Sequence, residues 1–491
     1  MIKIFNENIK QQKNFWSGCV FHPTDAVEDP WGKRILDQIA KDTSCRYVRI
    51  YTMFEDIVYY DGNDALQFDF RVSDLRMDYL VEQGFDLLLA YGGIPDCIAR
   101  SCNSKSSAAK GKTRYKGKMW NTSPPKTPEI WEEVCYQYTK HIVERYGIER
   151  VSKWYVHCLN EADTNLFFLG ELDWFAIEER IGEYYALYKA FVSGVRRVTK
   201  EIPLGGPALA FREDFLEGFL NRVKADGAEL DFISLHFYGA EPNELNDKTV
   251  SLSPENILEK LRSRLAVIKK CGFADKPIII DEWGACSHGF FNREECPLLL
   301  FRETEINSAY FVRLIYDFIH SGVPIEQLMI CLSGQHEMAE DFTGFRNFFT
   351  LNFIQKPIYN AYVLASKLGG SLLKHSCQNE NVSVIPTLTE KGYAILLTYA
   401  AQDFLQEIES IEERLVFEKD IQDKEVTVWC IDKTHTNPYR LYQRMGWDTL
   451  TPEQIAILRE EGKLKPISRG KGLQAVDLML TAGASFLITV E

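Results

Sequence analysis

The sequence predicts an α/β protein: a (β/α)8 TIM barrel followed by a C-terminal antiparallel β-sandwich domain. Two observations carry this prediction. Over the first three-quarters of the chain, eight short apolar runs alternate with longer amphipathic stretches, and after residue 370 shorter, partly alternating apolar segments are split by turn residues. The first pattern is typical of parallel strands covered by helices, and the second of an antiparallel sandwich.

The predicted barrel covers residues 14–370. Its strands are near-continuous apolar runs, as strands buried on both faces should be. They are residues 19–23, 47–51, 86–91, 154–161, 204–208, 232–238, 277–284 and 327–334, and the predicted helices are 30–41, 73–83, 129–146, 178–199, 212–225, 254–271 and 305–321. The alternative is an open doubly wound sheet. No GxGxxG follows the first strand and no Walker A sequence occurs, which favours the barrel.

The predicted sandwich covers residues 371–491, and residues 1–13 are expected to contribute a strand to it. Its strands are 371–377, 382–388, 393–401, 415–419, 426–431, 473–480 and 486–490. One helix interrupts them. Thr451 is the expected N-cap of this helix and Pro452 its first residue, and Gln454 completes a capping box with Thr451. The helix is expected to end at Gly462.

Composition excludes several functions. The chain has 491 residues, with 56 Lys+Arg against 70 Asp+Glu and a net charge of −14, which argues against nucleic-acid binding. No stretch of about 18 apolar residues suggests a membrane span. The 12 cysteines contain no CxxC pair, so zinc spacing is absent. Without an apolar run of signal-peptide length, we interpret them as reduced thiols of a cytoplasmic protein.

One loop, residues 101–128, follows the third predicted strand and should lie on the active face of the barrel. It carries six basic residues with no acid among them: Lys105, Lys110, Lys112, Arg114, Lys116 and Lys118. A solvated loop is one interpretation. Attraction of an anionic sugar is the other.

Two predicted barrel strands end in reactive groups: the fourth in Asn160 and Glu161, and the seventh in Asp281, Glu282 and Trp283. Barrel active sites lie where strands end, so the carboxylates should face one cavity. Glycoside hydrolysis needs such a pair, one carboxyl protonated and the other ionised. Either strand end alone is more often structural, but together they favour this function.

The sequence resembles glycoside hydrolase family 39, the β-xylosidase and α-L-iduronidase family of clan A, and within it the bacterial β-xylosidase branch. The resemblance covers nearly the whole chain. It is carried by 123–126, Trp131, 145–149, 153–154, 160–161, 205–208, 231–234, His236, Tyr238, 280–282, 445–446 and 465–466. These motifs are specific jointly rather than singly.

The resemblance implies a role for each site residue. Glu161 is the general acid/base, Glu282 is the nucleophile and Asn160 bonds the sugar 2-hydroxyl. Tyr238 keeps Glu282 ionised, and His236 contacts the substrate or orients a carboxylate. Trp283 and Trp120 are expected either as platforms under the sugar or as core residues. No cofactor or metal is expected.

Three positions depart from the family pattern. Ala162 replaces a Pro, Tyr51 stands where a His is usual, and Cys331-Leu332 replaces an aromatic residue. These departures concern the pocket for the terminal sugar rather than the mechanism. Four residues after the eighth strand are expected to supply sugar contacts or to be solvated loop groups: Gln335, His336, Glu337 and Arg346.

The predicted function is therefore that of a retaining exo-glycosidase acting on terminal β-linked sugars, with xylose as the leading sugar. The alternatives are a galactoside, glucoside, arabinoside or uronide hydrolase of the same mechanism, or an inactive sugar-binding homologue. The partner is a carbohydrate substrate. We also expect a homo-oligomer, because the apolar side chains of helix 451–461 must be covered by the barrel or by a neighbouring subunit.

Overall fold

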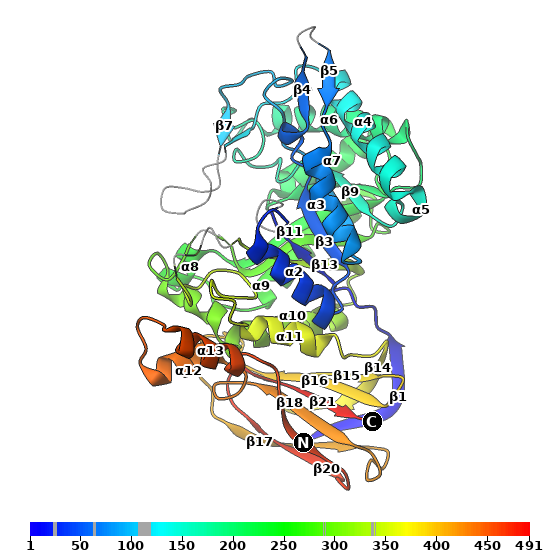
Figure 1. The fold of residues 1–491 in the computed structure, drawn as a ribbon. Coiled ribbons are helices and arrows are strands. Elements are labelled where there is room, and N and C mark those ends of the chain that lie inside the picture. Colours follow the sequence, from blue (N-terminus) through cyan, green and yellow to red (C-terminus); the bar gives the residue numbers. More distant parts are fainter. Residues whose placement is uncertain are drawn as a thin grey trace.

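The computed structural model describes residues 1–22, 27–61, 65–106, 119–287, 289, 291–334, 338 and 340–491. Figure 1 shows a barrel surrounded by helices, with the C-terminal strands packed below it. Both ends of the chain lie in this lower layer. In the described part of the chain, no helix is long and apolar enough to cross a membrane.

Eight parallel strands close into the barrel, and they follow one another around it in chain order. They are β2 (Gly18–Val20), β3 (Tyr47–Tyr51), β6 (Asp86–Tyr91), β9 (Tyr155–Cys158), β10 (Leu204–Leu209), β11 (Phe232–Ala240), β12 (Ile278–Cys286) and β13 (Ile325–Cys331). The last strand pairs with the first, which closes the barrel. The predicted barrel is confirmed, and the open-sheet alternative is wrong.

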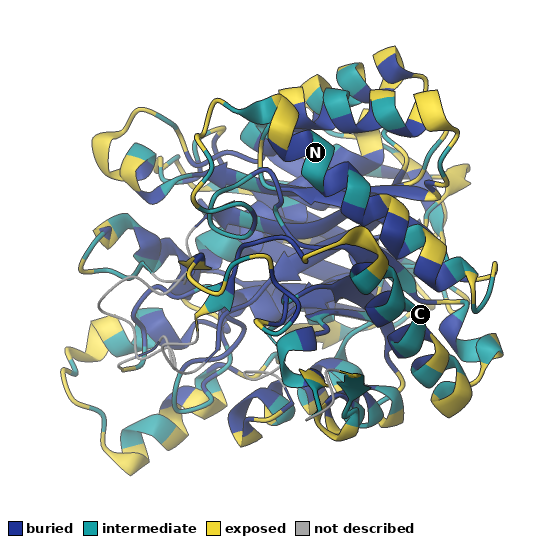
Figure 2. Ribbon diagram, turned by 90° about the horizontal axis from the view of Figure 1, so that it is seen from above, coloured by how far each residue is buried: buried dark blue, intermediate teal, exposed yellow. Residues whose placement is uncertain are grey.

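The helices cover the outside of the barrel: α2 (Pro30–Asp42), α3 (Arg71–Glu82), α4 (Pro128–Tyr146), α5 (Ile148–Val151), α6 (Ile177–Arg196), α7 (Glu213–Asp226), α8 (Pro242–Asp247), α9 (Glu255–Cys271), α10 (Glu305–Ser321) and α11 (Pro357–Ala365). Figure 2 shows buried strands at the centre and helices exposed along their outer faces. Side-chain caps begin several helices, among them Asp29, Thr127 and Thr304. Helix α11 is missing from the sequence prediction because it is almost wholly buried and has no amphipathic pattern.

Short elements lie within the loops that follow the barrel strands. They are η1 (Phe54–Asp56), β4 (Val58–Tyr60), β5 (Leu66–Phe68), β7 (Lys105–Ser106), β8 (Trp120–Asn121) and η2 (Pro297–Glu303). Strands β4 and β5 form one antiparallel pair, and β7 and β8 form another. The loops after β3 and β6 are therefore ordered in part by their own hydrogen bonds.

The C-terminal part is one nine-stranded sheet in the order β19-β18-β21-β16-β15-β14-β1-β17-β20. The strands are β1 (Ile2–Gln11), β14 (Ser371–Ser376), β15 (Val382–Leu388), β16 (Tyr393–Tyr399), β17 (Ile411–Phe417), β18 (Val426–Ile431), β19 (Pro466–Gly470), β20 (Ala475–Leu480) and β21 (Ala484–Val490). Strand β1 pairs antiparallel with β14 but parallel with β17. The sheet is thus mixed at this one pair. The sequence prediction lacks β19, whose side chains are mostly exposed.

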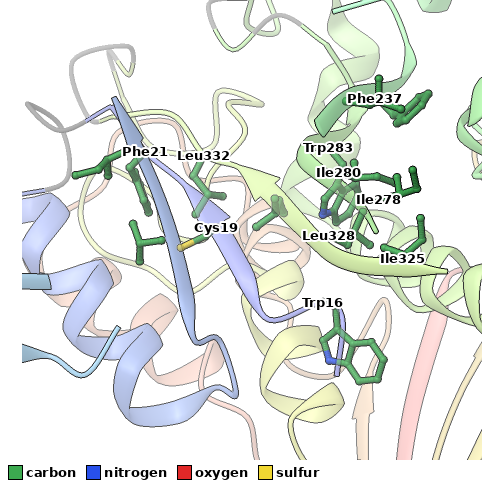
Figure 3. Packing of buried hydrophobic residues seen from close by; sticks show 14 of the residues in the cluster. Trp16, Cys19, Phe21, Phe237, Ile278, Ile280, Trp283, Ile325, Leu328 and Leu332 are labelled. Carbon is green, nitrogen blue, oxygen red and sulfur yellow. The ribbon is translucent and has the colours of Figure 1, made fainter. Parts of the chain in front are cut away.

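Two cores hold these layers together. The inner faces of the C-terminal strands enclose a mostly aliphatic cluster that includes Ile2, Val384, Ile395 and Leu415. The larger core lies between the barrel and its helices and continues into the C-terminal sheet. Figure 3 shows part of it around the ends of β2, β12 and β13. Because α10 contacts both β15 and β16, it packs between barrel and sheet.

Helices α12 (Pro438–Met445) and α13 (Pro452–Glu461) follow β18. The capping box of α13 joins Thr451 and Gln454, as the sequence predicts. Leu458 is fully buried in a cluster with Phe342 and Ile354, which belong to the segment after β13. Leu458 of α13 is therefore covered by its own chain, whereas Ile457 is exposed. Helix α12, absent from the prediction, buries only Pro438 and Tyr439.

Candidate active site

Glu161 and Glu282 lie together where the barrel strands end, Glu161 three residues beyond β9 and Glu282 within β12. A carboxylate oxygen of each and a ring nitrogen of His236 all lie within 4.8 Å of one another. The Glu282 side chain is buried, and that of Glu161 is 16% exposed. Carboxyl oxygens this close together fit the short spacing of about 5–5.5 Å in retaining glycosidases and not the spacing of about 6.5–9.5 Å in inverting ones.

A β-bulge in β12 turns Glu282 into the barrel. Leu235 of β11 pairs with Ile280, but the next residue, His236, pairs with Glu282, so Asp281 is an extra residue on β12. The neighbouring strand β13 shows a register shift at the same place. A bulge interrupts the in–out alternation of a strand. Asp281 and Glu282 therefore both face the barrel interior, although they are consecutive.

Both carboxylate oxygens of Glu282 are hydrogen-bonded. Arg49 Nη1 donates to Oε1 at 2.8 Å and the Tyr51 hydroxyl at 3.1 Å, while the Tyr238 hydroxyl donates to Oε2 at 2.7 Å. Arg346 Nη1 donates to the Tyr238 oxygen at 2.8 Å. Because a guanidinium only donates, the Tyr238 proton is directed to Glu282.

The pKa of Glu282 reflects these neighbours. Burial alone raises the pKa of this carboxyl, but the positive charges of His236, Arg49 and Arg346 and the Tyr238 hydrogen bond lower it to about 2. Glu282 is thus ionised at neutral pH. An ionised, oriented carboxylate at this position is suited to attack an electrophilic carbon.

Glu161 has the opposite environment. Burial raises the pKa of its carboxyl, and the hydrogen bond from His236 Nδ1, at 2.8 Å, lowers it by less. The residue has φ of +44°, in the left-handed region, and its N–H donates to the Ala208 carbonyl at 2.9 Å. Such backbone strain is common at active sites. The two carboxyl groups therefore differ in the direction of their pKa shifts, as an acid and a nucleophile require.

His236 lies between the acidic groups as a cation. Burial lowers the pKa of the imidazole, but the Glu282 and Asp281 carboxylates and the Glu161 hydrogen bond raise it to about 10. Its Nε2 is 3.5 Å from Asp281 Oδ2. Asp281 is also 3.0 Å from Arg49 Nε and 3.3 Å from His157 Nε2. The pKa of Asp281 stays far below its usual range, because Arg49 and His236 outweigh the effect of burial.

Asn160 is oriented by the same arginine. Arg49 Nη2 donates to Asn160 Oδ1 at 2.6 Å. The carbonyl of the side-chain amide is therefore occupied, and its NH2 group is the end that can donate to a substrate hydroxyl. Arg49, fully buried, thus contacts Asn160, Asp281 and Glu282 from strand β3.

The two predicted tryptophan platforms have different surroundings. Trp283 is a core residue: it is 1% exposed and stacks on Tyr310 and Phe311 of α10, as part of the buried cluster in Figure 3. The bulge that turns Glu282 inward turns Trp283 outward, so it cannot lie under a sugar in the barrel. Trp120 stacks on Phe167 in the loop after β9, and its ring nitrogen donates to the Leu166 carbonyl. It remains a candidate at the rim.

Two polar groups of the site, Arg49 and His157, are absent from the sequence prediction, which names Tyr51 only as a departure from the family pattern and Asp281 only as part of a strand end. Arg49 and Tyr51 belong to a strand that departs from the family pattern, and the structure shows that Tyr51 contacts Glu282. The signal that could have found Arg49 is a charged residue inside an apolar strand, since such a group is buried only when it is paired.

The remaining departures lie close to the site. Ala162 is fully buried, Cys331 belongs to the inner cluster of the barrel, and Leu332 belongs to the core outside it. Arg346 contacts Tyr238, as described above. Gln335, His336 and Glu337 lie outside the described residues, as do Lys110, Lys112, Arg114, Lys116 and Lys118 of the basic loop. Lys105 is described and pairs with Asp96.

Two clusters within the described residues have the composition of a metal site. The first is Glu161, His236 and Glu282, and the second is Cys430, Asp432 and His435. In the first, His236 Nδ1 is hydrogen-bonded to Glu161 Oε1 at 2.8 Å, and Glu282 is held by Arg49 and Tyr238. In the second, Asp432 accepts hydrogen bonds from the backbone N–H groups of Thr434 and His435, as in a tight turn. Both arrangements are accounted for by hydrogen bonding.

A family model and several known proteins match this chain. The family model "Glycosyl hydrolases family 39" matches residues 1–470. A β-xylosidase of Caldicellulosiruptor saccharolyticus is 25% identical over 94% of this chain and 91% of its own length. Human α-L-iduronidase is 27% identical over 31% of this chain and 23% of its own.

Solved structures share the fold. A monomeric β-xylosidase from Caulobacter crescentus has a TM-score of 0.83 at 19% identity, over 100% of this chain and 99% of that one. A bacterial orthologue of human α-L-iduronidase has a TM-score of 0.77 at 17% identity, over 100% and 83%. With the family model matching almost the entire length, the chain belongs to glycosyl hydrolase family 39 and is a glycoside hydrolase.

Proposed function

We propose that this protein is a retaining exo-glycosidase that removes terminal β-linked sugars, with xylose as the sugar, and that Glu282 is its nucleophile and Glu161 its acid/base. The observation that carries the proposal is the pair of carboxyl groups with oxygens within 4.8 Å and pKa values shifted in opposite directions. The separation leaves no room for a water molecule on the far side of the sugar, as inversion would need.

In the first step, Glu282 attacks the anomeric carbon while Glu161 gives its proton to the leaving oxygen. A covalent glycosyl–enzyme ester forms and the glycosidic bond breaks. In the second step, Glu161, now ionised, takes a proton from water, whose oxygen attacks the same carbon. The ester bond breaks, Glu282 is released as a carboxylate, and the sugar leaves with its configuration retained.

The neighbours of the two carboxyl groups fit these steps. The imidazolium of His236 donates to Glu161, which supports the ionised form that the second step needs. Tyr238 and Arg49 each hold one oxygen of Glu282, so little reorganisation is needed as its charge is lost. The NH2 group of Asn160 is placed to donate to the sugar 2-hydroxyl, a contact that strengthens in the transition state. Trp120 is proposed as a rim contact for the substrate.

The choice of xylose rests on relatives. Both the Caldicellulosiruptor protein and a Geobacillus stearothermophilus protein, 25% identical over 75% of this chain, are named β-xylosidases. Among the departures from the family pattern, Tyr51 contacts Glu282 and Cys331 belongs to the inner cluster of the barrel, so we propose that these two bear on the choice of sugar.

The test is a panel of nitrophenyl glycosides that includes β-xyloside, β-galactoside, β-glucoside, α-arabinoside and α-iduronide. We expect the highest kcat/KM for the β-xyloside. Proton NMR during the first turnovers should show the β-anomer of xylose first. A higher kcat/KM for a glycoside of another sugar would make that sugar, not xylose, the preferred substrate. An α-anomer formed first from a β-xyloside would overturn the retaining mechanism.

A homo-oligomer in the cytoplasm stays a prediction. Helix α13 buries Leu458 against its own chain but leaves Ile457 50% exposed, and Met445 at the end of α12 is 53% exposed. These apolar groups are available for a subunit contact. Light scattering at micromolar concentration measures the oligomeric state. A mass of 56.6 kDa, that of one chain, would reject the oligomer.

A further inference from the structure

Three large apolar side chains are exposed together on the loops after β9 and β10. Trp174, Phe175 and Phe211 are 36%, 85% and 51% exposed. Trp174 and Phe175 precede α6, and Phe211 precedes α7. In a barrel of this kind these loops lie on the face where the active site opens. Exposed aromatic side chains grouped in such a place indicate a binding surface.

Two of these rings form a fixed pair. The rings of Trp174 and Phe211 are 5.8 Å apart and inclined by 29°. The Arg212 guanidinium lies 4.6 Å from the Trp174 ring and donates to the Trp174 carbonyl at 2.7 Å. Arg212 is also paired with Asp214 at 2.7 Å. The pair is thus held in place before any ligand binds, which reduces the entropy lost on binding.

The same pair is tied to the backbone that carries Glu161. Asp163, fully buried and two residues after Glu161, accepts the backbone N–H groups of Ala210, Phe211 and Arg212 at 2.9–3.0 Å. The N–H of Glu161 itself donates to the carbonyl of Ala208. Segments 161–163 and 208–212 therefore lie side by side. The loop that carries Phe211 is thus bound to the segment that carries Glu161.

We propose that Trp174 and Phe211 form a platform for the leaving-group side of the substrate, where the apolar face of a pyranose ring stacks on the exposed aromatic surface. The proposal rests on the proposed function, because it takes Glu161 as the group that protonates the leaving oxygen. A leaving-group sugar must lie on the Glu161 side of the scissile bond. The ligand is thus the next sugar of a β-linked di- or oligosaccharide.

The experiment compares xylobiose with methyl β-D-xyloside, which has the same terminal sugar but no ring on the leaving side. For Phe211→Ala and Trp174→Ala we expect kcat/KM for xylobiose to fall about tenfold, the equivalent of one aromatic contact. For methyl β-D-xyloside, kcat/KM should stay within twofold. Phe211→Tyr, which keeps the ring, should restore activity on xylobiose.

The control is Leu75→Ala. Leu75 is a large apolar side chain that is 72% exposed on α3, away from these loops, and its loss should leave both substrates unchanged. Equal losses on both substrates in Phe211→Ala would overturn the platform, and so would a loss in Leu75→Ala as large as in Phe211→Ala. Calorimetric binding of xylobiose and of xylose to the inactive Glu282→Gln protein gives a second measurement, in which Phe211→Ala should weaken xylobiose alone.

Failure of the proposed function gives a different result. If the wild-type enzyme cleaves glycosides of another terminal sugar and no xyloside, the proposal that xylose is the sugar is wrong. The platform is then tested by the same comparison, made with the disaccharide and the methyl glycoside of that other sugar. If the aromatic variants change only the preference for the terminal sugar, measured with methyl glycosides, the platform is refuted while the glycosidase assignment stands.

Discussion

The centre of the barrel and the interior of the C-terminal sheet are both buried, but they are filled differently. Arg49, His157, His236, Asp281 and Glu282 lie within the barrel, each at most 5% exposed. The inner faces of the C-terminal strands carry aliphatic side chains such as Val384 and Ile395. Apolar side chains would fill the barrel without the free-energy penalty of burying charge, and such replacements of buried ion pairs are often stabilising. The buried charges of the barrel are therefore explained by their use in catalysis. The apolar core of the C-terminal sheet is explained by its contribution to the stability of the fold.

The largest expected effect on catalysis comes from Glu282→Gln. The amide has nearly the same shape but is not a nucleophile, so kcat should fall by about 10⁴–10⁶-fold while the fold is kept. A fluorinated sugar that traps the covalent intermediate should label Glu282 of the wild type, as mass spectrometry can show. The control is Asp281: a label there would mean that the bulge presents the wrong carboxylate as nucleophile.

The next effect depends on the substrate. In Glu161→Ala, kcat/KM for glycosides with poor leaving groups should fall by about 10²–10⁴-fold, and for activated aryl glycosides much less, because an acidic phenol leaves without a proton. Added azide should restore part of the turnover on the activated substrate and give a glycosyl azide. Losses of the same size on both kinds of substrate would place the acid elsewhere.

Arg49→Met tests the charged centre itself. Removing this cation leaves the negative charges of Asp281 and Glu282 buried without their shared positive partner. The free energy of unfolding should therefore fall by about 3–5 kcal/mol and kcat/KM by about 10²–10³-fold. The pKa of Glu282 is about 2 in the native site and should rise. Since catalysis needs this carboxylate ionised, the acidic limb of the kcat/KM profile should move to higher pH.

Arg46→Met is the matched control for Arg49→Met. Arg46 directly precedes β3, its side chain is 61% exposed, and it pairs with Asp86 outside the site. Its replacement should change the free energy of unfolding by less than about 1 kcal/mol and leave the pH profile unchanged. An acidic limb that stays in place in Arg49→Met would show that Tyr238, His236 and Arg346 hold Glu282 ionised without Arg49.

The smallest effect on catalysis is expected in the C-terminal sheet. Ile395→Ala removes buried methyl groups from its core and should lower the free energy of unfolding by about 2–5 kcal/mol, with kcat of the folded enzyme unchanged within twofold. Met479→Ala, at a side chain that is 52% exposed on β20, should change stability by less than about 0.5 kcal/mol. Urea unfolding measured beside initial rates checks both. A fall in kcat for Ile395→Ala would show that the two regions are coupled.

Local pattern was sufficient to predict the order of elements. Apolar runs separated by amphipathic stretches gave the eight barrel strands, and β3 and β6 have the predicted bounds. The capping box at Thr451 and Gln454 was also visible, because all its parts lie within four residues. Elements without a pattern were missed. Helix α11 is apolar all round, and β19 is polar and exposed.

The residue pattern is sufficient to assign one carboxylate to the end of the fourth barrel strand and another to the seventh strand. How these carboxylates are used depends on contacts between distant strands. The bulge at Asp281 depends on pairing with β11 and β13, and it reverses which of Glu282 and Trp283 faces inward. Arg49 lies 233 residues from Glu282 in the chain, and barrel closure brings them to 2.8 Å. A charged residue in an apolar strand is visible in the local sequence, but its partner is not. Neither that partner nor a one-residue change of register can be predicted locally, because both depend on strands that meet only in the folded chain.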